Sequence, residues 1–298
     1  MDDTEKKKIS FRQKNATKCP VCSSEFYKEE LFSGGGRLIA GRLTDELRRK
    51  YEDNKKYGKI YPLAYQLTVC PKCLYTAYPK DFPQLDHDEF ERLQNMTQTR
   101  KGAINRFFGD LDFNNDRNIY LGAASYLLAV ECYTARNKKV APTFKNAVSS
   151  IRAAWLFSDL AEMEPDKQYK KMSMFFYQKA YQYYVKVIEL IQNGAEPSEA
   201  AGNMGPDTDK NWGYEGILYL SALLTIKIGV LEKDIKKRIT SFEMSKRYLS
   251  RLFGMGKSSK NMPSEMLDKT RDVYDKLTSM ADEWNRQLAA ESQIAKDA

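Results

Sequence analysis

Two cysteine pairs with identical spacing constrain this chain most strongly. Cys19 and Cys22 form one C-x-x-C pair and Cys70 and Cys73 form another, so four of the five cysteines fall into two tight pairs. A two-residue spacer lets both thiolates of a pair face one ion, and Zn²⁺ accepts four sulfurs in a tetrahedron. The spacing therefore predicts one Cys₄ zinc site with these four ligands.

The four thiolates leave the nature of the metal partly open. A rubredoxin-like iron centre uses the same ligands, and the sequence does not exclude it. A redox dithiol would need only one pair, usually in a thioredoxin-like βαβ unit. Since sulfur fills all four positions, no position stays open for water, and we predict a structural metal. We expect Lys18 and Lys72, together with main-chain N–H groups, to offset the negative charge of the thiolates.

Charge and hydropathy predict a soluble, cytoplasmic protein with no membrane association. Residues 1–18 are polar and basic and lack the apolar stretch of a signal peptide. The longest uncharged stretch, 119–130, is too short to span a bilayer, and the mean hydropathy is −0.63. The net charge of +8 comes from 48 basic and 40 acidic residues that are largely interspersed, which is typical of solvated helical faces.

The chain divides into parts of different pattern. We predict a basic flexible tail over 1–18, a zinc-knuckle module over 19–85, a connecting helix over 86–115, and a helical domain over 116–298. The segment 194–211, rich in Gly, Pro and acidic residues, is an unusually long connection and is predicted to be mobile. The predicted fold class is therefore mainly α, with a small zinc-ribbon-like module of few short strands ahead of the helices.

Local patterns give the expected elements of the module. Residues 24–31 and 37–43 fit a strand and its return strand, joined at the turn 34–36, which consists of three glycines. A helical insertion is expected over 44–57 with Thr44 as its N-cap. Alternation over 65–69 predicts a half-buried strand that leads into Cys70.

The rest of the chain has helical periodicity. Asp86 and Glu89 form a capping-box pattern at the start of the connecting helix. Helices are expected near 117–137, 143–163, 166–193, 212–230, 235–253 and 263–290. Successive antiparallel pairs with small residues between them predict a tetratricopeptide-like array, although no regular repeat period is present.

Several segments resemble a known family. They are 19–26, 37–45, 62–65, 70–82 and, in the helical half, 153–156. Together they resemble domain-of-unknown-function family 2225, an uncharacterised bacterial family whose members join a cysteine-knuckle module to tetratricopeptide-like helices. The resemblance implies a zinc module and a helical scaffold, and it implies no activity.

One feature departs from that pattern. Glycine often follows the second cysteine of such knuckles, whereas this chain has Ser23 and Leu74 there. A left-handed backbone at each residue would cost about 1 kcal/mol. Metal binding worth about 10 kcal/mol or more could absorb that cost.

A cluster of tyrosines is the remaining signal for a binding surface. Tyr177, Tyr181 and Tyr184 recur at spacings of four and three and therefore share one face of a helix, while Tyr183 points elsewhere. Tyrosine combines apolar area with a polar tip and is enriched at interfaces. The trio is a candidate partner-binding surface, and packing between helices is the competing interpretation.

Residues for catalysis are scarce. The sequence has one histidine, His87, in an acidic and polar setting typical of a surface residue, and it contains no nucleophile elbow, HExxH motif or dinucleotide fingerprint. We therefore expect a protein that is not an enzyme. The leading hypothesis is an intracellular zinc-binding adaptor or scaffold that binds a protein or peptide through its helices.

The alternative hypothesis is a nucleic-acid-binding protein. In that interpretation basic residues of the zinc module and of the N-terminal tail contact phosphates while Tyr51 and Tyr57 stack on bases. The basic residues concerned are Lys6–Lys8, Arg42, Arg48, Arg49, Lys50, Lys55 and Lys56. Acidic residues at 45, 46, 52 and 53 are interleaved with them and weaken this hypothesis.

Overall fold

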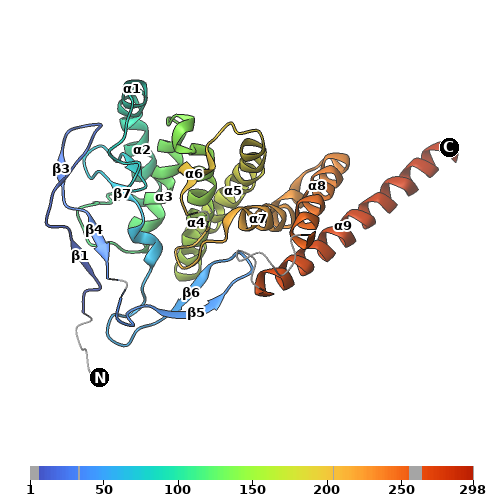
Figure 1. The fold of residues 1–298 in the computed structure, drawn as a ribbon, viewed down its shortest axis with the longest axis horizontal. Helices are drawn as coiled ribbons and strands as arrows, with labels where there is room; N and C mark the ends of the chain where they lie inside the picture. Colours follow the sequence, from blue (N-terminus) through green and yellow to red (C-terminus); the bar gives the residue numbers. More distant parts are fainter. Residues whose placement is uncertain (1–6, 33, 204, 255–263, 298) are drawn as a thin grey trace.

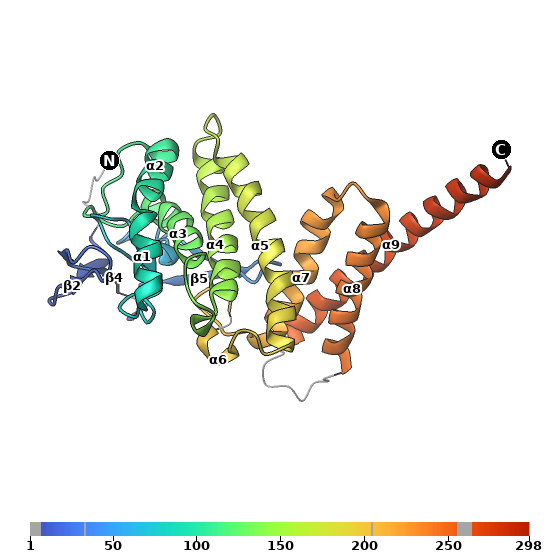
Figure 2. The same ribbon diagram turned by 90° about the horizontal axis from the view of Figure 1, so that it is seen from above.

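The computed structural model describes residues 7–32, 34–203, 205–254 and 264–297. Short strands occupy the N-terminal part and helices the remainder, which confirms the predicted fold class (Figure 1). The end of the last helix projects away from the other helices (Figure 2).

The N-terminal strands form two nested pairs. β1 (Ser10–Arg12) pairs antiparallel with β4 (Glu29–Leu31), and β2 (Thr17–Lys18) pairs with β3 (Glu25–Phe26) between them. Ser10 donates a hydrogen bond from its hydroxyl to the buried carboxylate of Glu29. The predicted tail over 1–18 is therefore corrected, because residues 10–18 contribute two strands to the fold.

A second hairpin replaces the helix predicted over 44–57. β5 (Ile39–Leu43) pairs with β6 (Arg49–Glu52), so β5 is not the return strand of 24–31. Thr44 accepts a hydrogen bond from the main-chain N–H of Arg48 and closes the turn, and Leu47 is left-handed with φ of 58°. Leu47 is fully buried, so contacts with distant helices outweigh the local helical pattern. We call residues 44–48 the hairpin tip.

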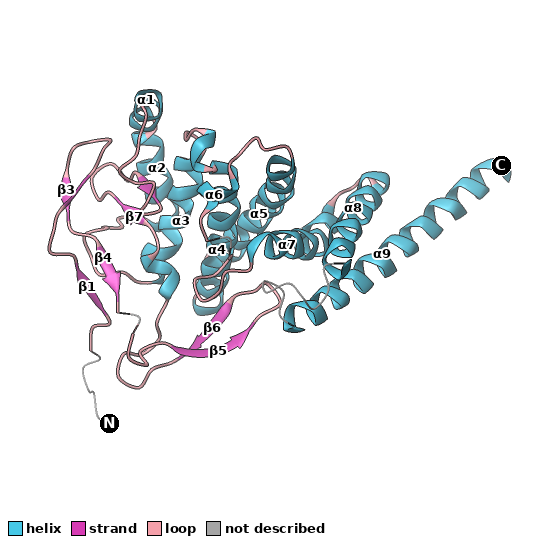
Figure 3. Ribbon diagram, in the orientation of Figure 1, coloured by secondary structure: helices cyan, strands magenta, loops and turns pink. Residues whose placement is uncertain are grey.

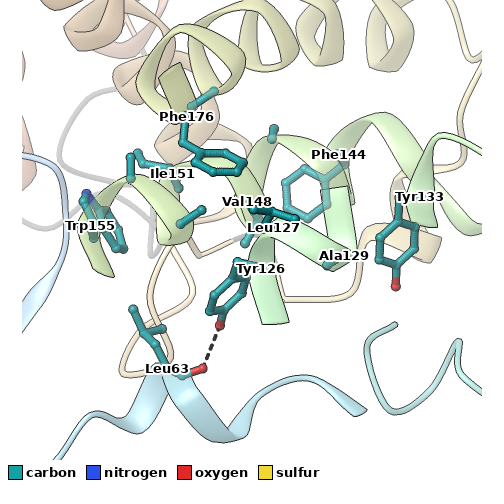
Figure 4. Close-up of a cluster of buried hydrophobic side chains, with 14 of the residues drawn as sticks. Leu63, Tyr126, Leu127, Ala129, Tyr133, Phe144, Val148, Ile151, Trp155 and Phe176 are labelled. Carbon is teal, nitrogen blue, oxygen red and sulfur yellow. Dashed lines mark hydrogen bonds between the residues drawn. The ribbon is translucent and has the colours of Figure 1, made fainter. Parts of the chain in front are cut away.

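The last part of the module packs tightly on a helix. The strand predicted over 65–69 is shorter in the structure: a 3-10 turn, η1 (Pro62–Tyr65), precedes β7 (Thr68–Val69), which pairs with β8 (Thr76–Ala77). Tyr126 donates a hydrogen bond to the carbonyl of Leu63 at 3.0 Å (Figure 4). A Cβ atom at Gly122 would lie 2.9 Å from the Cβ of Ala64, so glycine is needed for this close approach.

Two helices occupy the region predicted as one connecting helix. α1 (His87–Asn95) begins with the predicted capping box, in which the side chain of Glu89 accepts from the N–H of Asp86 at 2.9 Å. α2 (Thr97–Phe108) follows after Met96.

The long helices form the predicted array. Their bounds are α3 (Ile119–Tyr133), α4 (Pro142–Met163), α5 (Tyr169–Gln192), α7 (Gly213–Ile228), α8 (Ile235–Gly254) and α9 (Ser264–Asp297). Each packs on the next in this order, and α7 also contacts α9. Small residues of α4, including the fully buried Ala153 and Ala154, allow this close packing.

The connection 194–211 is anchored at several points. It contains the short helix α6 (Ser198–Ala201). Glu196 is buried and accepts hydrogen bonds from the N–H and hydroxyl of Thr143 at the start of α4. Arg152 donates to the carbonyl of Pro206 at 2.7 Å. The predicted mobile loop is thus held against α4, because buried polar groups of the connection find partners there.

The module and the array share one hydrophobic core. Phe26 and Phe82 of the module belong to the same buried cluster as Tyr126 and Trp155 of the array. The described residues of the predicted module over 19–85 therefore form no separate core.

Among the described helices, Gly213–Leu231 is long and apolar enough to cross a membrane by length and composition. Within the protein, 67% of this segment is buried, and it packs between α5, α8 and α9. Glu215 and Lys227 interrupt its apolar run, so the search for uncharged stretches in the sequence did not select this segment.

Candidate metal centre

Two hairpins carry the four cysteines to one point. Cys19 and Cys22 lie in the turn between β2 and β3, and Cys70 and Cys73 lie in the turn between β7 and β8. The two turns have the same main-chain hydrogen bonds. In each turn, the carbonyl of the first cysteine accepts a hydrogen bond at 2.9 Å from the N–H of the residue after the second cysteine, which is Ser23 or Leu74. The N–H of the first cysteine donates to the carbonyl of the following residue, which is Ser24 or Tyr75.

The sulfur positions fit a tetrahedral metal. The Sγ atoms of Cys19 and Cys73 lie 3.6 Å apart, as do those of Cys22 and Cys70, and all four lie within 4.8 Å of one another. Four sulfurs bound to Zn²⁺ at about 2.3 Å would be separated by roughly 3.8 Å. The four predicted ligands are therefore brought together at the separations that a metal ion requires.

The turns carry the backbone strain that the sequence suggested. Ser23 and Leu74 both have φ of 58°, the left-handed conformation that glycine usually provides. The main-chain N–H groups of Cys22, Cys73 and Tyr75 act to lower the pKa of Cys19, Cys70 and Cys73 respectively, because they favour the ionised sulfurs.

The electrostatics of the four sulfurs favour a bound cation. Hydrogen bonds with Cys19 and Cys70 raise the pKa of Cys73, and burial and the nearby charge of Cys19 raise it further. Hydrogen bonds from Cys19, Cys73 and the hydroxyl of Ser24 lower the pKa of Cys70. Cys19 and Cys73, whose pKa values are both raised, therefore resist ionisation, and a divalent ion would allow all four sulfurs to act as thiolate ligands.

A buried arginine near the ligands was missed at the level of sequence. The side chain of Arg100 in α2 is fully buried and donates to the carbonyl of Cys73 at 3.1 Å. Lys18 and Lys72, which were expected to compensate the charge, are exposed. Arg100 lies on the inner face of the predicted connecting helix, and this position could have indicated the contact, since arginine is rarely buried without a specific partner.

The tyrosines are divided between core and surface. Tyr177 and Tyr184 are buried, which fits the interpretation that they pack between helices. Tyr181 is half-buried and lines a groove between α5, α7 and α8. Of the three predicted partner-binding tyrosines, Tyr181 alone is partly accessible, and it lies beside this groove.

The hairpin tip is a polar site that sequence reasoning also missed. Trp155, Tyr177 and Lys227 all donate to the carboxylate of Glu46, the tyrosine hydroxyl at 2.7 Å. The residues come from α4, α5 and α7, so one acidic side chain joins three helices. β5 and β6 run below the array toward the start of α9 (Figure 3). The sequence did not suggest this site, because a helix was predicted over 44–57 and a helix there would not place Glu46 against the array.

A protein of Borreliella burgdorferi whose name is given as "Uncharacterized protein" is 45% identical over 273 residues, covering 91% of this chain and 97% of the relative. No solved structure matches the chain. A family model matches residues 13–277, which include all four cysteines and most of the array. The chain belongs to the family described as "Uncharacterized protein conserved in bacteria (DUF2225)".

Proposed function

We propose that this chain is an intracellular adaptor without enzymatic activity, in which a structural zinc ion holds the N-terminal module and the helical array binds a protein or peptide. The observation that carries the proposal is the groove beside Tyr181. Its volume is about 390 Å³, and it lies between α5, α7 and α8.

The walls of this groove suit a peptide side chain. Tyr181, Val185 and Tyr248 contribute apolar area, and Met244 is exposed at the surface. Ser221 lies in the wall, is fully buried, and has no hydrogen-bond partner for its hydroxyl within the described residues. A groove with apolar walls and a few polar groups is typical of sites that fix a ligand in one orientation.

The rim adds a charge preference. Lys236 and Lys237 are exposed at the edge of the groove and favour an acidic partner segment. The array binds the hairpin tip of the same chain through similar contacts. There Leu47 is buried, and the carboxylate of Glu46 accepts hydrogen bonds from Lys227 and Tyr177. We infer that the partner presents an extended segment with an apolar residue next to acidic ones.

Zinc is the metal that we propose for the four thiolates, and iron is the alternative. Cys₄ sites with closed coordination are the common structural form of zinc in proteins. The metal has no proposed role in binding the partner, because the groove lies on α5, α7 and α8 and the ligands lie in the N-terminal hairpins.

The nucleic-acid alternative finds less support. Arg48 and Lys50 pair with Asp159 of α4, and Arg49 pairs with Asp209. Basic residues that are committed to carboxylates of the same chain are less available for phosphates.

The test is affinity capture of the full-length chain from bacterial lysate, with and without nuclease. We expect a protein to be recovered equally in both, and Tyr181→Ala to reduce its recovery about tenfold, as loss of one interface tyrosine does. Tyr183→Ala on the same helix is the matched control and should leave recovery unchanged. Nuclease-sensitive recovery would favour nucleic acid, and equal recovery by both variants would remove the groove from the proposal.

A further inference from the structure

A second pocket lies where three parts of the chain meet. It has a volume of about 310 Å³ and is lined by residues of the segment 66–81, of α4, and of the connection 194–211. We call it the junction pocket. Its size lies at the lower end of the range for small-molecule sites. It shares no lining residue with the groove beside Tyr181.

Arg152 is the central cation of the junction pocket. The residue is 5% exposed, and its guanidinium donates to the carbonyls of Pro206 and Asp207 and, at 3.5 Å, to the hydroxyl of Tyr78. A guanidinium has about five N–H donors, and Tyr126 also lies beside Arg152, so at most two donors remain for a ligand. Within the described part of the chain, no carboxylate forms an ion pair with Arg152.

The nearest acidic residue of the connection is occupied elsewhere. The carboxylate of Asp207 accepts from the main-chain N–H groups of Arg49 and Thr208, both at 2.7 Å. The positive charge of Arg152 is therefore balanced only at longer range. A buried charge without a direct counter-ion is costly in a protein interior, and an anionic ligand would relieve that cost.

A lysine reinforces the positive potential. Lys145 is buried and donates from Nζ to Asp81 at 2.6 Å and to the carbonyl of Val140 at 3.0 Å, which leaves one of its donors. Asp81 also accepts from the hydroxyl of Tyr133 at 2.6 Å, so its charge is shared between two donors. Lys80 is exposed at the pocket, and Asp81 is the one carboxylate among the lining residues.

The other walls define the rest of the ligand. Phe144, Val148 and Ala201 form an apolar side, and Asn203 and Thr208 add an amide and a hydroxyl. Such walls suit an anion attached to a short apolar body better than a free inorganic ion, whose hydration they would not replace.

We propose that the junction pocket binds a small organic anion, with a carboxylate or phosphate held by Arg152 and Lys145 and a short apolar body against Phe144 and Val148. The ligand would contact the zinc module, α4 and the connection together. This site goes beyond the adaptor function, because neither the metal ligands nor the groove beside Tyr181 takes part in it.

The test is calorimetric titration of the full-length, metal-loaded chain with benzoate, phenyl phosphate and the uncharged benzamide. We expect saturable binding of at least one of the two anions in a ratio of one to one, and no binding of benzamide. The proposal is overturned if neither anion binds at concentrations up to about 10 mM, or if benzamide binds as well as the anions.

Variants assign the binding to this pocket. Ala200→Phe fills the pocket from α6 and should weaken binding at least about tenfold, and Lys80→Glu reverses a charge at its edge and should weaken binding about threefold or more. Lys233→Glu makes the same charge change on an exposed lysine outside the pocket and should leave affinity unchanged. Metal content and melting temperature show that each variant is folded. Equal affinity in all three variants would place the anion elsewhere and defeat the proposal.

Discussion

The two ends of this molecule are held together by different means. The N-terminal strands are two to five residues long and occur only as two-stranded pairs within the described chain, an arrangement that is marginally stable in water without other support. The array consists of helices of 15 to 34 residues, each packed on the next. The fold of the first region therefore relies on contacts between residues far apart in the sequence, among them the cysteines and the helices on which the strands pack. The second region follows from local periodicity and burial.

Buried polar contacts join the two regions. Arg48 of the hairpin tip pairs with Asp159 of α4. Arg136, which follows α3, donates to the hydroxyl of Tyr75 in the N-terminal module at 3.0 Å and pairs with Glu89 of α1 at 3.0 Å. Such pairs are weak evidence for stability by themselves, but breaking one leaves an uncompensated buried charge.

The largest expected effect is loss of the metal. Cys70→Ser removes one ligand, and the module should lose the binding energy of a structural metal, which is about 10 kcal/mol or more. We expect hydrogen exchange to become fast in residues 10–82 while α4 and α5 stay protected. Cys132→Ala is the matched control, because Cys132 is buried but is not one of the four ligands, and it should keep the metal. Equal loss of protection in both regions would show that the array also depends on the metal.

The next effect concerns the buried ion pair between Arg136, which follows α3, and Glu89 of α1. Arg136→Met leaves the fully buried carboxylate of Glu89 without its charge partner and should lower the free energy of unfolding by about 3–5 kcal/mol. Lys139→Met removes an exposed pair with Asp86 and should change the free energy of unfolding far less, because solvent screens the pair. Denaturant unfolding measures both variants, and similar small losses would mean that this contact contributes little to joining the regions.

The tyrosines of α5 separate core from surface. Tyr184 is 1% exposed, so Tyr184→Ala should cost about 3–5 kcal/mol, as removal of a buried aromatic ring does. Tyr181→Ala should cost about 1 kcal/mol, because the side chain is half-buried beside the groove. Thermal unfolding of the two variants tests this difference. A loss at Tyr181 as large as that at Tyr184 would assign Tyr181 to the core.

Much of the array could be predicted from the sequence. The expected helices near 143–163 and 235–253 match α4 and α8 closely, because apolar periodicity and a proline or cap at the start are local signals. The four cysteines were also found from spacing alone, and their sulfurs converge. In a C-x-x-C pair, the relative position of the two sulfurs is determined within a few residues of sequence.

The hairpin 39–52 and the pairing of β1 with β4 could not be predicted in this way. The long spacing between the two cysteine pairs and Thr44 as a possible N-cap suggested a helix over 44–57, but Glu46 and Leu47 contact helices more than 100 residues later in the chain. Strand pairing and the burial of Arg100 and Arg152 depend equally on distant contacts. Local propensity contains no information about such partners.

The smallest expected effect is on the pH dependence of the contact at the hairpin tip. Burial acts to raise the pKa of Asp159, but Arg48 and Lys50 lower it below its ordinary value of 3.8. The stabilisation is therefore fully present above the unfolded pKa and is lost as pH falls through the folded pKa. Between about pH 5 and pH 3, wild-type stability should fall by about 1 kcal/mol more than that of Asp159→Asn. Identical pH profiles would show that Asp159 does not contribute this linkage.

The central claim is that one metal ion, held by Cys19, Cys22, Cys70 and Cys73, organises the N-terminal region. X-ray absorption spectroscopy and elemental analysis of the full-length protein, purified without added metal, test it most directly. The predicted result is about one zinc per chain with four sulfur neighbours at about 2.3 Å. A protein that is folded and carries no metal would contradict the claim, and nitrogen or oxygen among the nearest neighbours would contradict the ligand set.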